Sequence, residues 1–160
     1  MLNQKFIISI SCLLSLFYSG SIYAQKAPYF ELPGDSEIIK LSDYTGKVIY
    51  LDFWASWCIP CQKSFPWMNK MHAKYDSKKF VIIAINLDTT KADAHKFLNK
   101  VPANFTVAYD TDGEVASKYK LKVMPSSYLI DTTGALVYSH KGYRESDVIS
   151  IEDKIQKHLN

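Results

Sequence analysis

The sequence predicts an α/β domain in which helices flank a central mixed sheet, with a closing β-hairpin and a C-terminal helix. Two nearly continuous apolar runs, Val48–Trp54 and 80–87, are typical of strands buried on both faces of a sheet. Helical patterns alternate with these runs, so right-handed crossovers and a parallel sheet are expected in the first half. The strand candidates 127–130 and 135–139 enclose a turn with Gly134, which predicts an antiparallel hairpin.

The remaining elements follow from periodicity and from turn residues. A helix is predicted from 59 to about 78, and Pro66 inside it is expected to kink it. The last helix, 145–159, has an apolar stripe typical of a helix packed on a core. The shorter predicted elements are an irregular lead-in at 25–46 with a weak strand at 37–41, a helix at 91–100, a strand at 105–109 and a helix at 113–119.

Length and composition fit one globular domain with a short appendage. The chain has 160 residues, of which 48% are hydrophobic and 22% are charged. A domain of this size buries a real core, and no internal repeat or linker divides it further. The formal net charge is +3 and the lysines are scattered, so nucleic acid is not predicted as a partner.

The N-terminus has the order of a secretory signal peptide. Lys5 precedes an apolar stretch at 6–18, and small and polar residues follow it up to Ala24. We therefore predict a signal peptide at 1–24, a folded domain at 25–160, and an exported protein that works in the periplasm or otherwise outside the cytoplasmic membrane. The alternative is an uncleaved membrane anchor, although the dense apolar part is short for a membrane span.

Export would change the cysteine count. Of the three cysteines, Cys12 leaves with the signal peptide, and Cys58 and Cys61 remain with two residues between them. A bridge across so short a loop removes little entropy from the unfolded chain, so it stabilises the fold little. Because exported proteins meet an oxidising environment, we interpret the pair as redox-active rather than structural.

Cys58 stands where a buried strand ends and a helix is expected to begin. The free N–H groups and the dipole of a first helical turn favour negative charge, so they stabilise a thiolate there. A thiolate is the nucleophile of disulfide exchange, and Cys61, one turn further on, can attack the mixed disulfide and release the product. Pro60 stiffens this turn at a position where a missing N–H is tolerated.

Asp52 is the one acidic or basic residue within the apolar run Val48–Trp54. A buried carboxylate without a partner tends to take up a proton, so the pKa of Asp52 is expected to rise. A carboxyl with a shifted pKa in this segment favours a functional role for Asp52. The alternative is an ordinary carboxylate at a solvent-facing strand end.

The segment 57–61, Trp-Cys-Ile-Pro-Cys, with Asp-Phe-Trp-Ala at 52–55 before it, resembles the active-site segment of thioredoxins. The lead-in 41–47, the insert at 88–112 and the segment 123–131 are more similar to the exported TlpA/ResA branch of that superfamily. The resemblance implies a thioredoxin-like fold and a thiol–disulfide oxidoreductase, with protein-disulfide reduction as the favoured direction.

The resemblance covers roughly residues 28–158 and implies three catalytic roles. Cys58 is the attacking thiol and Cys61 is the resolving thiol. Asp52 matches the buried acid of thioredoxins, which helps to move the proton of the inner cysteine.

The same resemblance implies a substrate-binding surface. Pro125 is expected to be a cis proline that faces the cysteine pair, although most prolines are trans. Met124 is expected to offer backbone groups to an extended substrate. Trp57, beside a cysteine expected to be exposed, is assigned to the docking surface together with Pro60. Trp54 is left open between packing and docking.

The predicted cofactor is none beyond the redox-active disulfide Cys58–Cys61, and no metal is predicted. A zinc site would need further ligands at suitable spacing, and covalent haem would need a histidine where Gln62 stands. The predicted partners are protein thiols and disulfides and a membrane electron donor, with a role in cytochrome maturation and a monomeric state. A thiol peroxidase of related fold and a non-catalytic thioredoxin-like binding module remain as alternatives.

Overall fold

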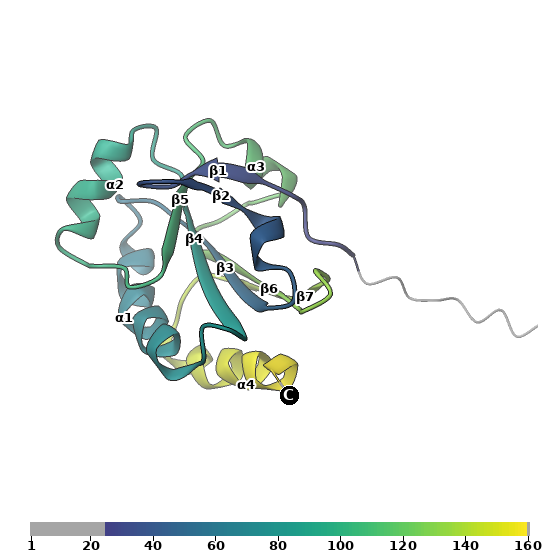
Figure 1. Ribbon diagram of the computed structural model, residues 1–160. Helices are drawn as coiled ribbons and strands as arrows, with labels where there is room; N and C mark the ends of the chain where they lie inside the picture. Colours follow the sequence, from purple (N-terminus) through teal and green to yellow (C-terminus); the bar gives the residue numbers. More distant parts are fainter. Residues whose placement is uncertain (1–24, 160) are drawn as a thin grey trace, which may run out of the picture.

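A computed structural model describes residues 25–159, so the predicted signal peptide at 1–24 lies outside the described residues. The described part folds around one five-stranded sheet with helices on both sides (Figure 1). None of the helices in this part of the chain is long and apolar enough to cross a membrane.

The sheet has the strand order β5-β4-β3-β6-β7. Its strands are β3 (Val48–Trp54), β4 (Phe80–Asn86), β5 (Thr106–Tyr109), β6 (Ser126–Ile130) and β7 (Leu136–Lys141). The central strand β3 pairs in parallel with β4 and antiparallel with β6, and all seven of its residues are buried. β4 pairs in parallel with β5, and β6 and β7 form the antiparallel closing hairpin. The predicted mixed sheet and hairpin are therefore confirmed.

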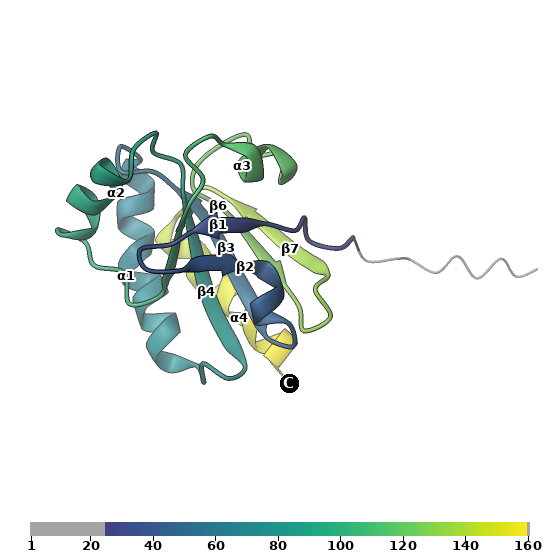
Figure 2. The same cartoon turned by 45° about the horizontal axis from the view of Figure 1, so that its top comes forward.

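Different elements cover the two faces of the sheet (Figure 2). The helices α1 (Ile59–Lys74), α2 (Lys91–Leu98) and α4 (Val148–Leu159) contribute to the apolar core on one face, which we call the α1 face. The opposite face is covered by a two-stranded ladder of β1 (Glu31–Pro33) and β2 (Ile38–Lys40), by the short helix η1 (Leu41–Tyr44) and by α3 (Glu114–Lys118).

Successive side chains of a strand point to opposite faces, so β3 serves both cores. Ile49, Leu51 and Phe53 belong to the core beneath β1, β2 and α3. Tyr50 and Trp54 belong to the core of the α1 face, and Asp52 stands between them with the same orientation. The single carboxylate of β3 is thus buried on the side that carries the cysteine helix.

Several predicted bounds are wrong at their ends. α1 ends at Lys74 rather than near 78, because Tyr75 is extended and the backbone N–H groups of Lys79 and Phe80 turn back to Asp76. α2 ends at Leu98 rather than at 100. The final helix begins with a separate 3-10 turn, η2 (Glu145–Asp147). The weak strand expected at 37–41 is β2, and its pairing with β1 had no signal in the sequence.

Candidate active site

Cys58 is the N-cap residue of α1 and forms a disulfide with Cys61. The Sγ of Cys58 also accepts a hydrogen bond from the backbone N–H of Cys61 at 3.3 Å. It therefore lies among the N–H groups that a first helical turn leaves without intrahelical partners, which is the environment that stabilises a thiolate once the bridge is reduced. Cys58 is only 5% exposed and Cys61 is fully buried. The expectation of an openly exposed Cys58 is thus wrong.

The loop from β3 to Cys58 is held by Asp88, which follows β4 and is 3% exposed. Both carboxylate oxygens of Asp88 accept from the backbone N–H of Ser56, at 3.0 and 3.2 Å, and Oδ1 also accepts from the Ser56 hydroxyl at 3.0 Å. The side chain of Asn86 donates to Oδ2 at 2.8 Å. A buried carboxylate with several donors is a rigid anchor, so Asp88 determines where the chain enters α1.

The opposite wall of the site begins at the C-terminus of α3. The N–H of Leu121 donates to the carbonyl of Ala116 at 3.0 Å, and the N–H of Lys120 donates to that of Ser117 at 2.9 Å. These two bonds form a Schellman motif, which requires a left-handed residue at its turn. Lys120 occupies that position with φ of 53°, where glycine is the usual residue. The motif turns the chain toward the cysteines.

The loop then reaches Met124–Pro125, which is a cis peptide bond, so the predicted cis proline is confirmed. Ser126 hydrogen-bonds the carbonyl of Val123 at 2.8 Å through its hydroxyl. The carbonyl of Pro125 accepts from the N–H of Gly142 at 2.8 Å, beyond the end of β7. These contacts on both sides of the proline define the path of the loop in front of Cys58.

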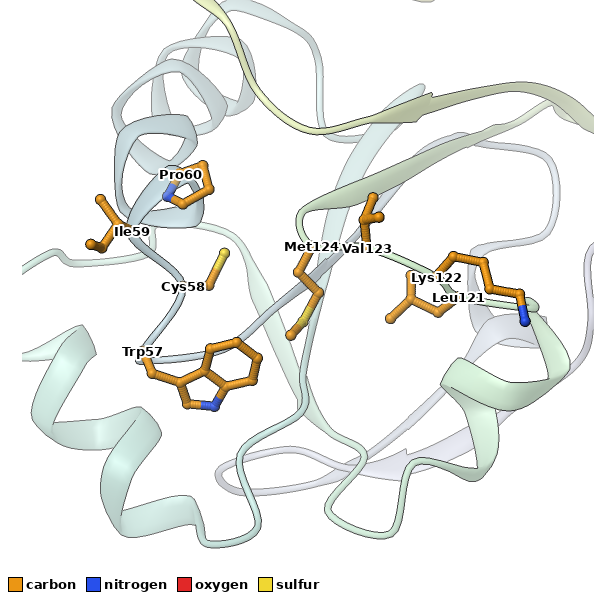
Figure 3. Close-up of a pocket in the computed structure, with 8 residues that line it drawn as sticks. All are labelled: Trp57, Cys58, Ile59, Pro60, Leu121, Lys122, Val123 and Met124. Carbon is orange, nitrogen blue, oxygen red and sulfur yellow. The ribbon is translucent and has the colours of Figure 1, made fainter.

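A cavity of about 550 Å³ separates these two walls (Figure 3). The residues that line it are Trp57, Cys58, Ile59, Pro60, Leu121, Lys122, Val123 and Met124. The lining is mainly apolar, and the ammonium of Lys122 points away from Cys58 (Figure 3). Trp57 and Ile59 are each 67% exposed, so the rim offers apolar surface to a partner. Cys58 is thus reached through an apolar opening.

Asp52 lies in the interior and is 1% exposed. Its Oδ1 accepts a hydrogen bond from the hydroxyl of Ser127 at 2.8 Å, and its Oδ2 has no partner among the described residues. Burial raises the pKa of Asp52 to about 7, and the Ser127 hydrogen bond opposes that rise. The expected burial and raised pKa of Asp52 are confirmed, and the carboxyl can exchange a proton near neutral pH.

The structure brings the predicted site residues to two places. Trp57, Pro60 and Met124 line the cavity beside Cys58, whereas Asp52 lies outside its lining, in the α1 face. The open question about Trp54 is answered by packing, because this residue is fully buried; its ring contacts are with Phe65 and Phe97.

Sequence reasoning missed two polar residues that support the site, Asp88 and Ser127. Asp88 had a weak signal, since it follows the carboxyl end of a buried parallel strand, where functional groups gather. Ser127 had none, because its contact with Asp52 depends on the pairing register of β3 and β6.

Comparisons with known proteins agree with this site. The sequence profile of the AhpC/TSA family matches residues 23–139. Thiol-disulfide oxidoreductase ResA of Bacillus thuringiensis subsp. konkukian is 34% identical over 134 residues, which cover 83% of this chain and 76% of that protein. ResA of Bacillus subtilis is 32% identical over 140 residues, with 82% and 78% covered.

Among solved structures, a Chlorobium tepidum protein provisionally assigned as thiol:disulfide interchange protein DsbE is similar, with a TM-score of 0.84. It is 52% identical, and the match covers 86% of this chain and 97% of that one. The fold, the bridged Cys58–Cys61 pair at the start of α1 and these relatives agree. The chain therefore belongs to the thioredoxin-like AhpC/TSA family and is a ResA-type thiol–disulfide oxidoreductase.

Proposed function

We propose that the protein is an exported protein-disulfide reductase that works through a mixed disulfide at Cys58. The observation that carries this proposal is the Cys58–Cys61 bridge, with Cys58 at the N-terminus of α1 and at the edge of an apolar cavity. Such a cavity accepts an extended polypeptide, and the helix start lowers the free energy of a thiolate at Cys58.

In the first step, the reduced Cys58 thiolate attacks one sulfur of a substrate disulfide. A bond forms between Cys58 and that sulfur while the substrate S–S bond breaks, and the second substrate sulfur leaves as a thiolate that takes a proton from water. Trp57, Pro60 and Met124 flank Cys58 on both walls of the cavity, so they are proposed to form the docking surface for the substrate chain. Pro125, the buried neighbour of Met124, is proposed to support that surface through its cis peptide bond.

In the second step, Cys61 resolves the mixed disulfide. Its thiol gives a proton to the carboxylate of Asp52, and the resulting thiolate attacks the sulfur of Cys58. The Cys58–Cys61 bridge forms, the bond from Cys58 to the substrate breaks, and the substrate sulfur that was bound to Cys58 leaves as a thiolate that takes a proton from water. Two electrons have then passed from the dithiol to the substrate, and a membrane electron donor outside the described chain restores the dithiol.

The place of action follows from the same proposal. The signal-like segment at 1–24 supports work outside the cytoplasmic membrane, and relatives named thiol-disulfide oxidoreductase support protein thiols or disulfides as substrates. Reduction of cysteines for cytochrome maturation is one such task. The chain is proposed to act as a monomer, with no cofactor other than its own cysteine pair.

Turnover by cysteine variants tests the proposal. The wild-type protein with a dithiol donor is expected to reduce a protein disulfide, and Cys58→Ser is expected to abolish turnover because the nucleophile is lost. Cys61→Ser is the matched variant, which keeps the nucleophile and should accumulate a covalent mixed disulfide visible by mass spectrometry. Equal turnover by the wild type and Cys58→Ser would contradict the proposal.

The direction of electron flow is measured separately, by equilibrating the cysteine pair with glutathione. A reductant is expected to have a potential near that of thioredoxin, about −270 mV, and not near the value of about −120 mV for a strong oxidant such as DsbA. A value close to the oxidant would reverse the proposed direction while leaving the cysteine chemistry intact.

A thiol peroxidase is the second candidate, and the match to the AhpC/TSA family profile favours it. A peroxidase would oxidise Cys58 to a sulfenic acid that Cys61 then condenses with, releasing water. The proposed reductase is expected to consume peroxide much more slowly than it reduces protein disulfides. Rapid peroxide-dependent loss of both thiols would favour the peroxidase instead.

A further inference from the structure

Three polar side chains form a directed chain of hydrogen bonds in the core of the α1 face. The hydroxyl of Tyr50 donates to the Oγ of Ser127 at 2.7 Å, and the hydroxyl of Ser127 donates to Oδ1 of Asp52 at 2.8 Å. Ser127 lies directly opposite Asp52 in the β3–β6 register, and Tyr50 lies two residues before Asp52. All three residues are buried, at 3% exposure or less.

The direction of this chain is determined by its members. A serine hydroxyl has one proton, so Ser127 can accept from Tyr50 and donate to Asp52 at once. Burial raises the pKa of Tyr50 well above its ordinary value, and the nearby Asp52 adds to the rise, so Tyr50 stays a neutral donor. Each bond in the chain polarises the next, which strengthens the bond received by Asp52.

The two oxygens of Asp52 are therefore not equivalent. Oδ1 accepts from Ser127, whereas the buried Oδ2 has no partner within residues 25–159. Unpartnered buried polar atoms are uncommon and often mark a reactive position. In the protonated carboxyl, the proton is expected on Oδ2, because Oδ1 already faces a donor hydroxyl.

We propose that Ser127 and Tyr50 are positioning residues, which hold the Asp52 carboxyl through Oδ1 and leave Oδ2 as the oxygen that exchanges a proton with Cys61. This inference rests on the reductase function proposed above. In the exchange, the S–H bond of Cys61 breaks, an O–H bond forms at Oδ2, and the electron pair stays on the sulfur as a thiolate. No electron leaves the protein in this step.

Other groups on the same face could influence the titration of Asp52. β7 contributes His140, which is opposite Ser127, and Tyr138, with Tyr143 following the strand. α1 contributes Cys61, and β4 contributes the uncharged Ala84 opposite Asp52. Burial is the largest cause of the raised Asp52 pKa, and the Ser127 hydrogen bond is the cause that lowers it. The serine hydroxyl is thus the group whose removal tests the proposal.

The test is a carboxyl titration of the oxidised protein by carbon-13 NMR, with Asp52→Asn used to assign the signal. Ser127→Ala is expected to raise the midpoint of Asp52 by about one pH unit, because a hydrogen bond to the carboxylate is lost. Tyr50→Phe is expected to raise it by less, because the serine remains. Ser127→Thr keeps the hydroxyl and is expected to restore the wild-type midpoint.

Tyr128→Phe is the matched control for the loss of a hydroxyl. Tyr128 is adjacent to Ser127 in β6, points to the opposite face and donates to the backbone carbonyl of Tyr119. Its loss is expected to leave the Asp52 midpoint unchanged. An unchanged midpoint in folded Ser127→Ala, or an equal rise in Tyr128→Phe, would overturn the positioning role.

A second readout tests the exchange with Cys61. The carboxylate form of Asp52 accepts the proton, so the rate of disulfide reduction is expected to rise with pH through the Asp52 midpoint. In Ser127→Ala this rise should move to higher pH by the same amount as the NMR midpoint. A rate profile that does not follow the midpoint would refute the exchange. A wild type without any turnover would refute the reductase function, and the titration would still decide the positioning role.

Discussion

Two buried aspartates flank the cysteine segment, and their surroundings differ in one respect. Asp88 is 3% exposed and has donors on both oxygens, from the backbone and hydroxyl of Ser56 and from the amide of Asn86. Asp52 is 1% exposed and has one donor, Ser127, on one oxygen. The two carboxylates are therefore buried to a similar extent, but they differ in the number of hydrogen-bond donors that they accept from.

This difference separates a carboxylate that holds structure from the one that we propose exchanges protons. A buried carboxylate whose two oxygens both accept hydrogen bonds is fixed in position and becomes a rigid part of the fold. A buried carboxylate with one donor is held near the balance between its charged and neutral forms. Asp88 thus stabilises the loop that leads to Cys58, whereas Asp52 is available for chemistry, and substitutions at the two positions are expected to have opposite effects on stability.

Removal of Asp88 is expected to have the largest effect. Asp88→Ala leaves the N–H and hydroxyl of Ser56 and the amide of Asn86 without their acceptor, so the free energy of unfolding is expected to fall by roughly 3 to 5 kcal/mol. Chemical denaturation of the oxidised protein measures this loss. A loss below about 1 kcal/mol would mean that water replaces the carboxylate as the acceptor, and it would contradict the role of Asp88 as a structural anchor.

Asp52→Asn is expected to change stability in the opposite direction. The folded pKa of about 7 lies above the ordinary value of 3.8, so the folded state binds more protons than the unfolded state between these pH values. Wild-type stability therefore contains a penalty that is absent below pH 3.8, grows as the pH rises, and is complete above about pH 7. At pH 8 the variant is expected to be more stable by about 2 to 4 kcal/mol, since each pKa unit corresponds to about 1.4 kcal/mol and the buried amide has a cost of its own.

Unfolding of the wild type and the variant between pH 4 and 8 measures this effect. The difference in stability is expected to grow with pH, whereas the variant should reduce disulfides more slowly because the proposed proton acceptor of Cys61 is lost. A difference that does not depend on pH would mean that Asp52 ionises in the folded protein as it does in the unfolded chain. The proposed proton exchange at Asp52 would then lose its basis.

The features that the sequence predicts well are those with local causes. The strand β3 agrees with its predicted bounds, because a short run that is apolar apart from Asp52 is typical of a strand buried on both faces of a sheet. The spacing of Cys58 and Cys61, together with the strand before them, predicts a cysteine pair at the start of a helix. The hairpin of β6 and β7 follows from the turn at Gly134, where φ is +80°. The carboxyl in β3 was recognised because it interrupts an apolar run.

The features that the sequence does not predict depend on contacts between distant segments. Ser127 meets Asp52 only because β6 pairs with β3 in one register, and a shift of one residue would turn its hydroxyl to the other face. Asp88 meets Ser56 across 32 positions of sequence. Periodicity along a single segment contains no information on such pairings.

The two walls of the cavity also differ in how they are held, since one is anchored by Asp88 and the other begins at the backbone turn of Lys120. Lys120 adopts the left-handed conformation, which is unfavourable for a residue with a Cβ by roughly 1 to 2 kcal/mol. Lys120→Gly is expected to raise the free energy of unfolding by about 0.5 to 1 kcal/mol, because relief of this strain exceeds the extra entropy of glycine in the unfolded chain. This is the smallest of the expected effects, and thermal unfolding detects it.

The same substitution two residues earlier provides the control. Lys118 is an exposed residue of α3 with helical backbone, so Lys118→Gly is expected to lower stability by about 0.5 to 1 kcal/mol through the poor helix propensity of glycine. Opposite signs at two exposed lysines would show that the second wall carries strain in its backbone, whereas the first is held by side-chain hydrogen bonds. Destabilisation at both positions would mean that the turn at Lys120 is relaxed, and that the two walls differ only in the carboxylate.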